Sequence, residues 1–145
     1  MRLWHKDLIK VLPQQQLISQ WRELCCIVSN MIKYKTPNHI LVNKILDYPA
    51  SHFVRYTQLV LTEMNNRGYN VSKESLDKYN YNLNLVKEYF HSKDEEVKDE
   101  DIFKNWHNNR YLVQCHYNLQ EKYDCGGISE DDYKKICDVV YFILT

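Results

Sequence analysis

The chain has 145 residues, which is enough for one compact domain with its own hydrophobic core. Its 19 basic and 19 acidic residues give a net charge of zero, so the total charge argues against a strongly basic or strongly acidic protein. Only three glycines and three prolines are present, which favours helices over a turn-rich β fold. The sequence has no long apolar run and no signal-peptide core, so we expect a cytoplasmic protein without a membrane span.

The charge is unevenly distributed along the chain. Residues 1–60 contain eight basic and three acidic residues, a net charge of +5, and the remainder carries −5. Phosphate binding needs local positive charge more than a basic total, and the first 60 residues offer it. The alternative at this point is a dipolar protein with no role in nucleic-acid binding.

The five cysteines are an odd number in a chain that is large enough to fold without disulfides, so free thiols are expected. No cysteine pair has the spacing of a metal knuckle. We therefore expect no cofactor, and no metal at His91, His107 or His116.

The first predicted element is a helix from Pro13, placed in the first turn, to about Met31. Its apolar positions recur at three- and four-residue spacing, at Leu17, Trp21, Leu24 and Val28. The polar face should be solvated, and it comprises Gln15, Ser19 and Arg22, with Gln16, Gln20 and Glu23 beside it. The residues before Pro13 are expected to be a short lead.

A second helix is predicted from an N-cap at Ser51 to Arg67, with Gly68 in the left-handed position that ends it. The apolar spacing behind this prediction runs through Phe53, Tyr56, Val60 and Met64. The preceding stretch, 33–49, should be irregular apart from a helical turn or two at 40–46.

Residues 72–90 alternate Asn and Tyr, and only 86–90 have a helical pattern. The charged run 93–101 predicts a solvated loop or the start of a helix.

Two further helices are predicted near the C-terminus. Strict four-residue spacing of Tyr111, Cys115, Leu119 and Tyr123 predicts a helix over 106–123, which Gly126 and Gly127 end. Ser129 followed by Asp132 predicts a capped final helix to about Phe142. The expected product is a single all-α domain over residues 1–145, with three to five helices.

Three short stretches share a pattern with one known family. They are Leu12-Pro-Gln-Gln-Gln-Leu17 followed by Trp21-Arg-Glu-Leu24, then Glu63-Met-Asn-Asn-Arg-Gly-Tyr-Asn70, and Leu119-Gln-Glu-Lys122. They resemble the first helix, the end of the middle helix and the late helix of pyrimidine-dimer DNA glycosylase/AP lyases of the phage endonuclease V type. The opening Met-Arg-Leu-Trp-His is similar to that of an uncharacterised bacterial branch often grouped with this family.

The resemblance implies a small α-helical enzyme whose N-terminal segment packs into the active-site cleft. In that family the N-terminal α-amine attacks C1′ of a damaged nucleotide, forms a Schiff base and nicks the strand by β-elimination. An α-amine has a reference pKa of about 7.7–8.0, so a useful fraction is neutral near pH 7. Arg2 is bulky, so the initiator methionine should remain, and Met1 would present the amine where the phage enzyme uses Thr. Glu23 would be the essential acid, which stabilises positive charge at C1′.

The resemblance also implies that Arg2, Gln15, Arg22 and Lys122 contact DNA phosphates. The expected partner is double-stranded DNA with a damaged or abasic site, bound by a monomer. Each residue has a plainer reading. The alternatives are an ion-pair partner for Arg22 and ordinary surface charges on helices for Glu23 and Lys122.

The chain departs from the family pattern at several positions. Cys26 stands in place of a phosphate-binding Arg, Gln16 in place of a His and Asn118 in place of a late Arg. The aromatic, basic C-terminal tail of the family is absent, since the chain ends in Tyr141-Phe-Ile-Leu-Thr145. These departures remove positive charge, so the sequence favours an N-glycosylase/AP lyase scaffold over specificity for pyrimidine dimers.

Two other functions fit the sequence. One is a non-catalytic nucleic-acid-binding module, and a helix-turn-helix around Gly126 is one form of it. Acidic Glu130, Asp131 and Asp132 would face phosphate there, which argues against that form. The other is a protein-interaction domain that uses acidic residues within 94–101 or the Tyr-rich middle. The arrangement that separates these functions is a Met1 amine near Glu23, with Arg2 and Arg22 on the rim of one cleft.

Overall fold

The computed structural model describes residues 1–92 and 96–145, and these residues form helices and no β-strand. The α-helices are α1 (Gln14–Tyr34), α2 (Ala50–Asn66), α3 (Lys73–Val86), α4 (Asn109–Asp124) and α5 (Glu130–Leu144). Shorter 3₁₀ helices are η1 (Lys6–Val11), η2 (Val42–Asp47), η3 (Lys87–Tyr89) and η4 (Asp99–Asp101). The prediction of an all-α fold is confirmed, and the α-helices of the described residues number five.

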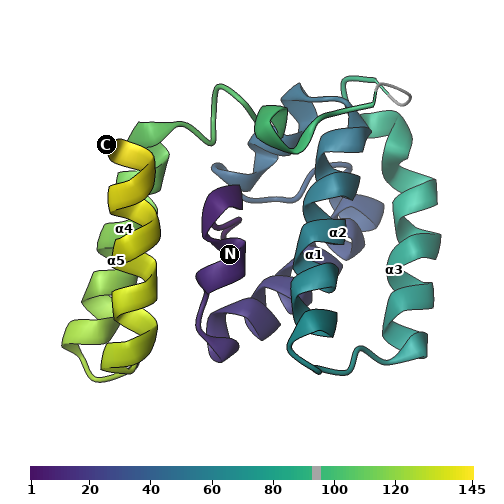
Figure 1. Cartoon of the computed structure of the whole chain (residues 1–145). Helices are drawn as coiled ribbons and strands as arrows, with labels where there is room; N and C mark the ends of the chain where they lie inside the picture. The colour runs from purple at the N-terminus through teal and green to yellow at the C-terminus, as the bar shows by residue number, and fades with distance from the viewer. Residues whose placement is uncertain (93–95) are drawn as a thin grey trace.

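The N-terminal segment lies between two groups of helices (Figure 1). On one side α4 and α5 form an antiparallel hairpin, and on the other side α1 packs against α2 and α3. The 3₁₀ helix η1 contacts both α5 and α2, so it joins the two groups. Leu3, Leu8 and Leu12 of this segment are almost completely buried. The expected short lead is therefore a structured part of the core.

Helix α1 confirms the first predicted helix, although it runs three residues further than expected. Pro13 directly precedes the helix, with φ near −57°, and Lys35 ends it in a left-handed conformation at φ 66°. Its apolar face contributes Leu17, Leu24 and Met31 to the core. The helix therefore has one face in the core between α2 and α3.

Helix α2 begins earlier than predicted, so Ser51 is not the N-cap. The N-cap position is Pro49, which has no side-chain hydrogen bond there. The backbone N–H of Ala50 instead donates to the carbonyl of Ser92 at 2.7 Å. A distant carbonyl thus satisfies one of the donors that the first turn of the helix leaves free. Gly68 has φ 78°, the left-handed conformation predicted for the end of this helix.

Helix α3 occupies a stretch for which the sequence predicted almost no helix. Ser72 is its N-cap, and its hydroxyl accepts a hydrogen bond from the Ser75 N–H at 3.1 Å. Buried Tyr79, Leu83 and Val86 form its inner face. Part of the charged run 93–101 lies outside the described residues, and 99–101 form η4.

Helices α4 and α5 confirm the two predicted C-terminal helices with shifted ends. Helix α4 begins at Asn109, because the Asn108 side chain accepts from the Tyr111 N–H at 3.0 Å and caps it. Ser129 caps α5 as predicted, since its hydroxyl accepts from the Asp132 N–H at 3.1 Å. Residues 106 and 107 are buried ahead of α4, in irregular chain.

All five cysteines carry free thiols, as predicted. Among the described residues, none of the helices combines the length and the apolar character needed to cross a membrane.

Candidate active site

The N-terminus of the chain lies against Glu23 of α1. The backbone N–H of Arg2 donates a hydrogen bond to Glu23 Oε2 at 3.1 Å. Only Met1 Cα and its carbonyl carbon separate the Met1 α-amine from that nitrogen, so the amine lies on the same side as the carboxylate, although the two form no ion pair. The structure thus brings together the two residues that the resemblance implied as catalytic.

The two residues remain open to the surface. Met1 is 40% exposed, and Glu23 is half-buried. Within residues 1–92 and 96–145 the α-amine forms no ion pair. A substrate could therefore reach the amine without displacing a salt bridge.

Gln20 lies one helical turn before Glu23 and bonds to the same segment. Its side-chain oxygen accepts from the Trp4 N–H at 2.9 Å, and its nitrogen donates to the Arg2 carbonyl at 2.9 Å. The same nitrogen is 3.5 Å from Glu23 Oε2. Gln20 is completely buried, so the expectation that it belongs to a solvated stripe is wrong. Burial is tolerated because both ends of the amide have hydrogen-bond partners.

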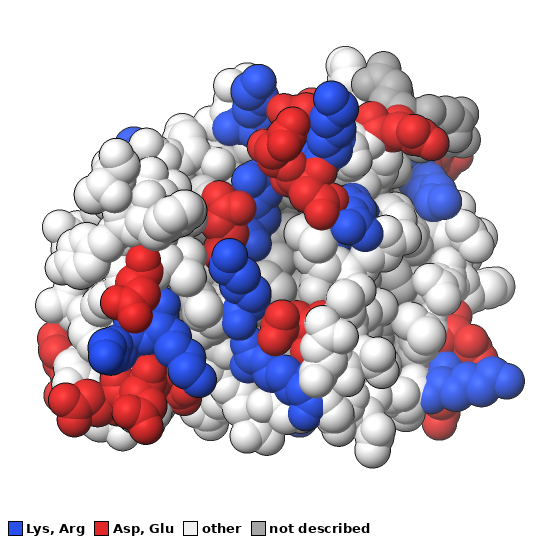
Figure 2. All heavy atoms as spheres, in the orientation of Figure 1, with Lys and Arg blue, Asp and Glu red and all other residues white. Residues whose placement is uncertain are grey.

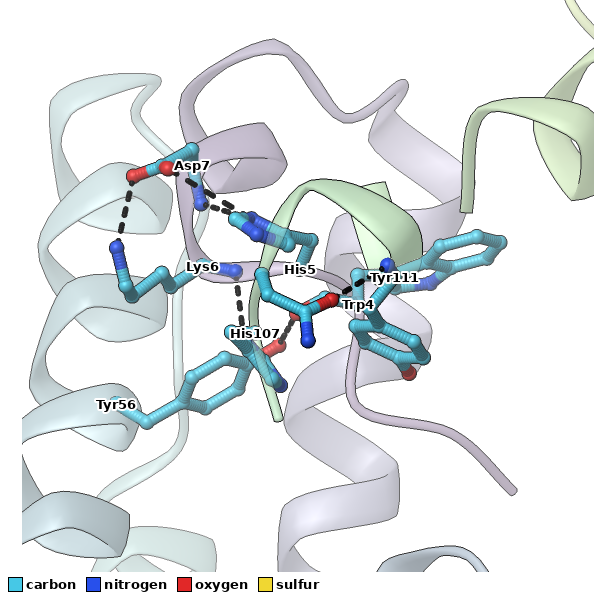
Figure 3. Close-up of polar contacts among 8 residues, drawn as sticks. Trp4, His5, Lys6, Asp7, Tyr56, His107 and Tyr111 are labelled. Atoms are coloured by element: carbon cyan, nitrogen blue, oxygen red, sulfur yellow. Dashed lines mark hydrogen bonds and ion pairs between the residues drawn. The ribbon is translucent and has the colours of Figure 1, made fainter. Parts of the chain in front are cut away.

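Two buried tyrosines donate to the next two carbonyls of the segment, and Figure 3 draws the bond of one of them, Tyr56, to Trp4. The hydroxyl of Tyr56 on α2 donates to the Trp4 carbonyl at 2.6 Å. The hydroxyl of Tyr111 on α4 donates to the Leu3 carbonyl at 2.6 Å. Burial raises the pKa of both phenols above the usual value, so both stay protonated donors.

Two buried histidines continue this network, as Figure 3 shows. His107 Nδ1 accepts from the Lys6 N–H at 3.0 Å, and His5 Nδ1 accepts from the Asp7 N–H at 3.1 Å. Burial lowers the pKa of His5 to about 4 and that of His107 well below the usual value. Both rings are therefore neutral near pH 7, as acceptance of an N–H at Nδ1 requires.

Arg2 points toward α4. Its guanidinium lies 4.9 Å from the centre of the Trp4 ring and beside Tyr111 and Cys115. A cation over an aromatic face is a favourable arrangement, so part of the Arg2 side chain is held by packing.

Arg22 and Gln15, two of the predicted DNA-binding residues, line one hollow. It has a volume of about 400 Å³ and lies between α1 and the start of α5, where Gly127, Ser129 and Asp132 also line it. Both Arg22 and Gln15 are exposed. Arg2 is not part of this lining, so the structure does not place Arg2 and Arg22 on the rim of that one hollow.

Lys122 is exposed near the end of α4. Its carbonyl accepts from the N–H of Gly127 at 2.8 Å, and Gly127 lines the hollow that contains Gln15 and Arg22. Lys122 therefore lies next to a residue of this hollow, but it does not line the hollow itself. Neither Lys122 nor Arg22 forms an ion pair with another described residue.

In the described part of the chain, no three His, Cys, Asp or Glu side chains are grouped so that they could hold a metal ion. His107, one of the histidines considered for a metal, is a hydrogen-bond acceptor for the backbone.

Sequence reasoning missed the side chains that hold the N-terminal segment. Gln20 carried a usable signal, because it lies three residues after Leu17 and four before Leu24, on the apolar face of α1. A polar side chain at such a position must have a buried partner. Tyr56 and Tyr111 follow the apolar spacing, and that spacing does not reveal where a hydroxyl points. His107 gave no signal.

These features define a class of small all-α protein. In this class the N-terminal segment is buried between helices, and the N-terminus lies beside a carboxylate of the first long helix. A family model described as pyrimidine dimer DNA glycosylase matches residues 1–77, more than half of the chain. The chain belongs to this family. The match includes Met1, Gln20, Glu23 and Tyr56 but ends before Tyr111. No curated protein and no solved structure matches the chain.

Proposed function

We propose that this protein is a DNA N-glycosylase with AP lyase activity that uses the Met1 α-amine as its nucleophile and Glu23 as its essential acid. The observation that carries the proposal is the 3.1 Å hydrogen bond from the Arg2 N–H to Glu23, which sets residue 1 beside a carboxylate. Exposure of Met1 and membership of the family support it further.

The proposed reaction proceeds in two stages. The neutral amine attacks C1′ of a damaged nucleotide, and the base leaves with the electron pair of the glycosidic bond. The nitrogen loses one proton to the departing base and, as the C1′–O4′ bond opens, the second to O4′, which gives an imine between Met1 and C1′. Loss of a C2′ proton then expels the 3′ phosphate and nicks the strand, and water hydrolyses the imine to free the enzyme.

Glu23 has two roles in this proposal. Its negative charge stabilises the cation that develops at C1′ and the protonated imine. It also accepts the C2′ proton during elimination. Oε2 accepts from Arg2, whereas Oε1 has no hydrogen-bond donor among the described residues, so Oε1 is free to face the substrate.

We assign phosphate contacts to Arg2, Gln15, Arg22 and Lys122. The exposed Arg22 and Gln15 line the same hollow, and the Lys122 carbonyl is hydrogen-bonded to Gly127 of that hollow. This proximity supports a common role for the three residues. The partner in this proposal is double-stranded DNA with a damaged or abasic site, and the protein acts as a monomer. Exposed Cys26, in place of a family Arg, favours broad recognition of abasic DNA over dimer specificity.

Borohydride trapping on a duplex with one abasic site tests the proposal. The wild-type protein should give a covalent protein–DNA adduct and a nicked strand. Glu23→Gln should reduce nicking by at least about 100-fold, the scale expected for loss of acid–base catalysis. The matched control is Glu74→Gln, which changes an exposed carboxylate on α3 and should leave nicking unaltered. Absence of any adduct from the wild-type protein at low salt would remove the enzymatic proposal.

The second candidate is a non-catalytic nucleic-acid-binding protein on the same fold. The zero net charge and the free Cys26 favour it, because both indicate weaker phosphate binding than the family pattern implies. It predicts salt-dependent DNA binding without an adduct, and binding that Glu23→Gln does not change. A protein-interaction domain predicts no DNA affinity even at low salt.

A further inference from the structure

The N-terminal segment from Arg2 to Lys6 is held by side chains rather than by a neighbouring strand. Its alternate N–H groups each meet a side-chain acceptor. Arg2 donates to Glu23, Trp4 donates to Gln20 and Lys6 donates to His107, at 3.1, 2.9 and 3.0 Å. These three acceptors come from α1 and from the irregular chain before α4.

Three consecutive carbonyls of the same segment are also bonded. Those of Arg2, Leu3 and Trp4 accept from Gln20, Tyr111 and Tyr56, at 2.9, 2.6 and 2.6 Å. The Tyr56 hydroxyl also lies 3.0 Å from the Gln20 oxygen, so its single proton is shared between two acceptors and Tyr56 contacts Gln20 directly. Leu3, Trp4 and His5 are nearly inaccessible to solvent, and buried backbone groups of this kind are costly to leave unpaired.

We infer that Gln20, Tyr56 and Tyr111 are positioning residues that fix the register of this segment and thereby the place of the Met1 α-amine beside Glu23. The segment cannot slide by one residue without breaking all six bonds at once. The neighbouring helices α1, α2 and α4 each supply one of the three side chains. The position of the amine therefore depends on how these three helices pack. This inference rests on the proposed function, because it concerns the same amine.

Two readouts separate positioning from general stability. The first is hydrogen exchange of the Trp4 amide, measured without DNA. The second is the single-turnover rate of imine trapping, compared with the affinity for the same abasic duplex. Loss of positioning raises exchange and slows trapping while affinity stays close to wild type. The unpaired backbone groups also lower the melting temperature, so both readouts are taken where each variant is fully folded.

The primary variants are Gln20→Leu and Tyr111→Phe, and their matched controls are Gln114→Leu and Tyr117→Phe, which alter exposed side chains on α4. We expect each primary variant to raise Trp4 amide exchange and slow trapping by at least about tenfold, the effect of misplacing a reacting group. The controls should change neither. Unchanged Trp4 exchange in both primary variants, or faster exchange with wild-type trapping, would overturn the inference.

A second variant leaves the core intact. One glycine added before Met1 moves the amine outward by about 3.5 Å and alters none of the six bonds. The inference predicts wild-type Trp4 exchange and loss of trapping, and trapping at the wild-type rate would contradict it. If the unaltered protein gives no adduct, the proposed function fails. Trp4 exchange in Gln20→Leu and Tyr111→Phe then decides alone whether these side chains hold the segment.

Discussion

His5 and His107 stack in the core with their ring centres 5.2 Å apart. Lys6 and Asp7 flank the pair along the chain, and Tyr56 and Tyr111 pack against His107. Both histidines accept a backbone N–H, so protonation of either ring at Nδ1 breaks a bond that holds the N-terminal segment.

This pair predicts a loss of stability in mild acid. Burial lowers the pKa of His5 to about 4 and that of His107 well below the usual 6.5. The unfolded chain therefore binds protons first as the pH falls. Stability is fully present above about pH 6.5 and decreases below it by up to about 1.4 kcal/mol per pH unit for each histidine. Urea unfolding at about pH 7 and pH 5 measures this loss.

The control for the acid effect is a histidine outside the core. His107→Gln should reduce the dependence on pH, whereas His91→Gln, at an exposed position, should retain it. Equal stability of the wild-type protein at both pH values would show that the two rings are not held neutral.

At the scale of elements, α3 contributes more to the core than its polar sequence indicates. Leu83 is 5% exposed and Leu85 on the same helix is 52% exposed. The Tyr79 ring lies 5.3 Å from that of Trp21 on α1, and its hydroxyl is 2.6 Å from Thr57 Oγ1 on α2. The inner face of α3 thus packs against both neighbouring helices.

Leu83→Ala should lower the free energy of unfolding by about 2–5 kcal/mol, because it leaves a cavity in the core. Leu85→Ala removes the same atoms from an exposed position and should cost much less. Chemical denaturation of the two variants gives the comparison. Equal losses would mean that α3 does not pack as described.

The sequence predicted those elements whose apolar spacing is regular, and it missed those set by distant contacts. The helices at α1, α2, α4 and α5 follow from such spacing. Helix α3 was missed because its Asn and Tyr residues have low helix propensity, so packing on α1 decides its structure. Ser51 was placed wrongly because the helix already begins at Ala50, whose N–H bonds to the carbonyl of Ser92, more than 40 residues away in the chain.

The candidate site likewise combines a residue that local sequence identifies with residues that only distant contacts bring together. Glu23 was identifiable because a local motif surrounds it. The side chains that hold the N-terminal segment come from three helices and from His107, two residues before α4, and no local pattern joins them. Only Gln20, a polar residue on an apolar face, offered a signal in the sequence.

At the scale of the whole molecule, the surface carries both signs of charge. On the face drawn in Figure 2, basic and acidic side chains are interspersed and no large area has one sign. The net charge is zero, although residues 1–60 carry +5. DNA affinity should therefore depend on a few local cations rather than on a broad field.

Arg22→Gln should weaken binding to abasic duplex DNA and lower the slope of log affinity against log salt concentration by about 1, the effect of one lost phosphate contact. Lys104→Gln provides the control, since its exposed ammonium lies 3.7 Å from Asp101 in η4. A salt slope that Arg22→Gln leaves unchanged would exclude this residue from the phosphate contacts.

We propose that the protein reacts with DNA through the Met1 α-amine. The most direct measurement is to trap the protein on an abasic duplex with borohydride, digest the adduct and locate the attached sugar by mass spectrometry. The sugar should be attached to the α-amine of Met1. Attachment to an internal lysine, such as Lys6 or Lys10, or the absence of any adduct, would contradict it.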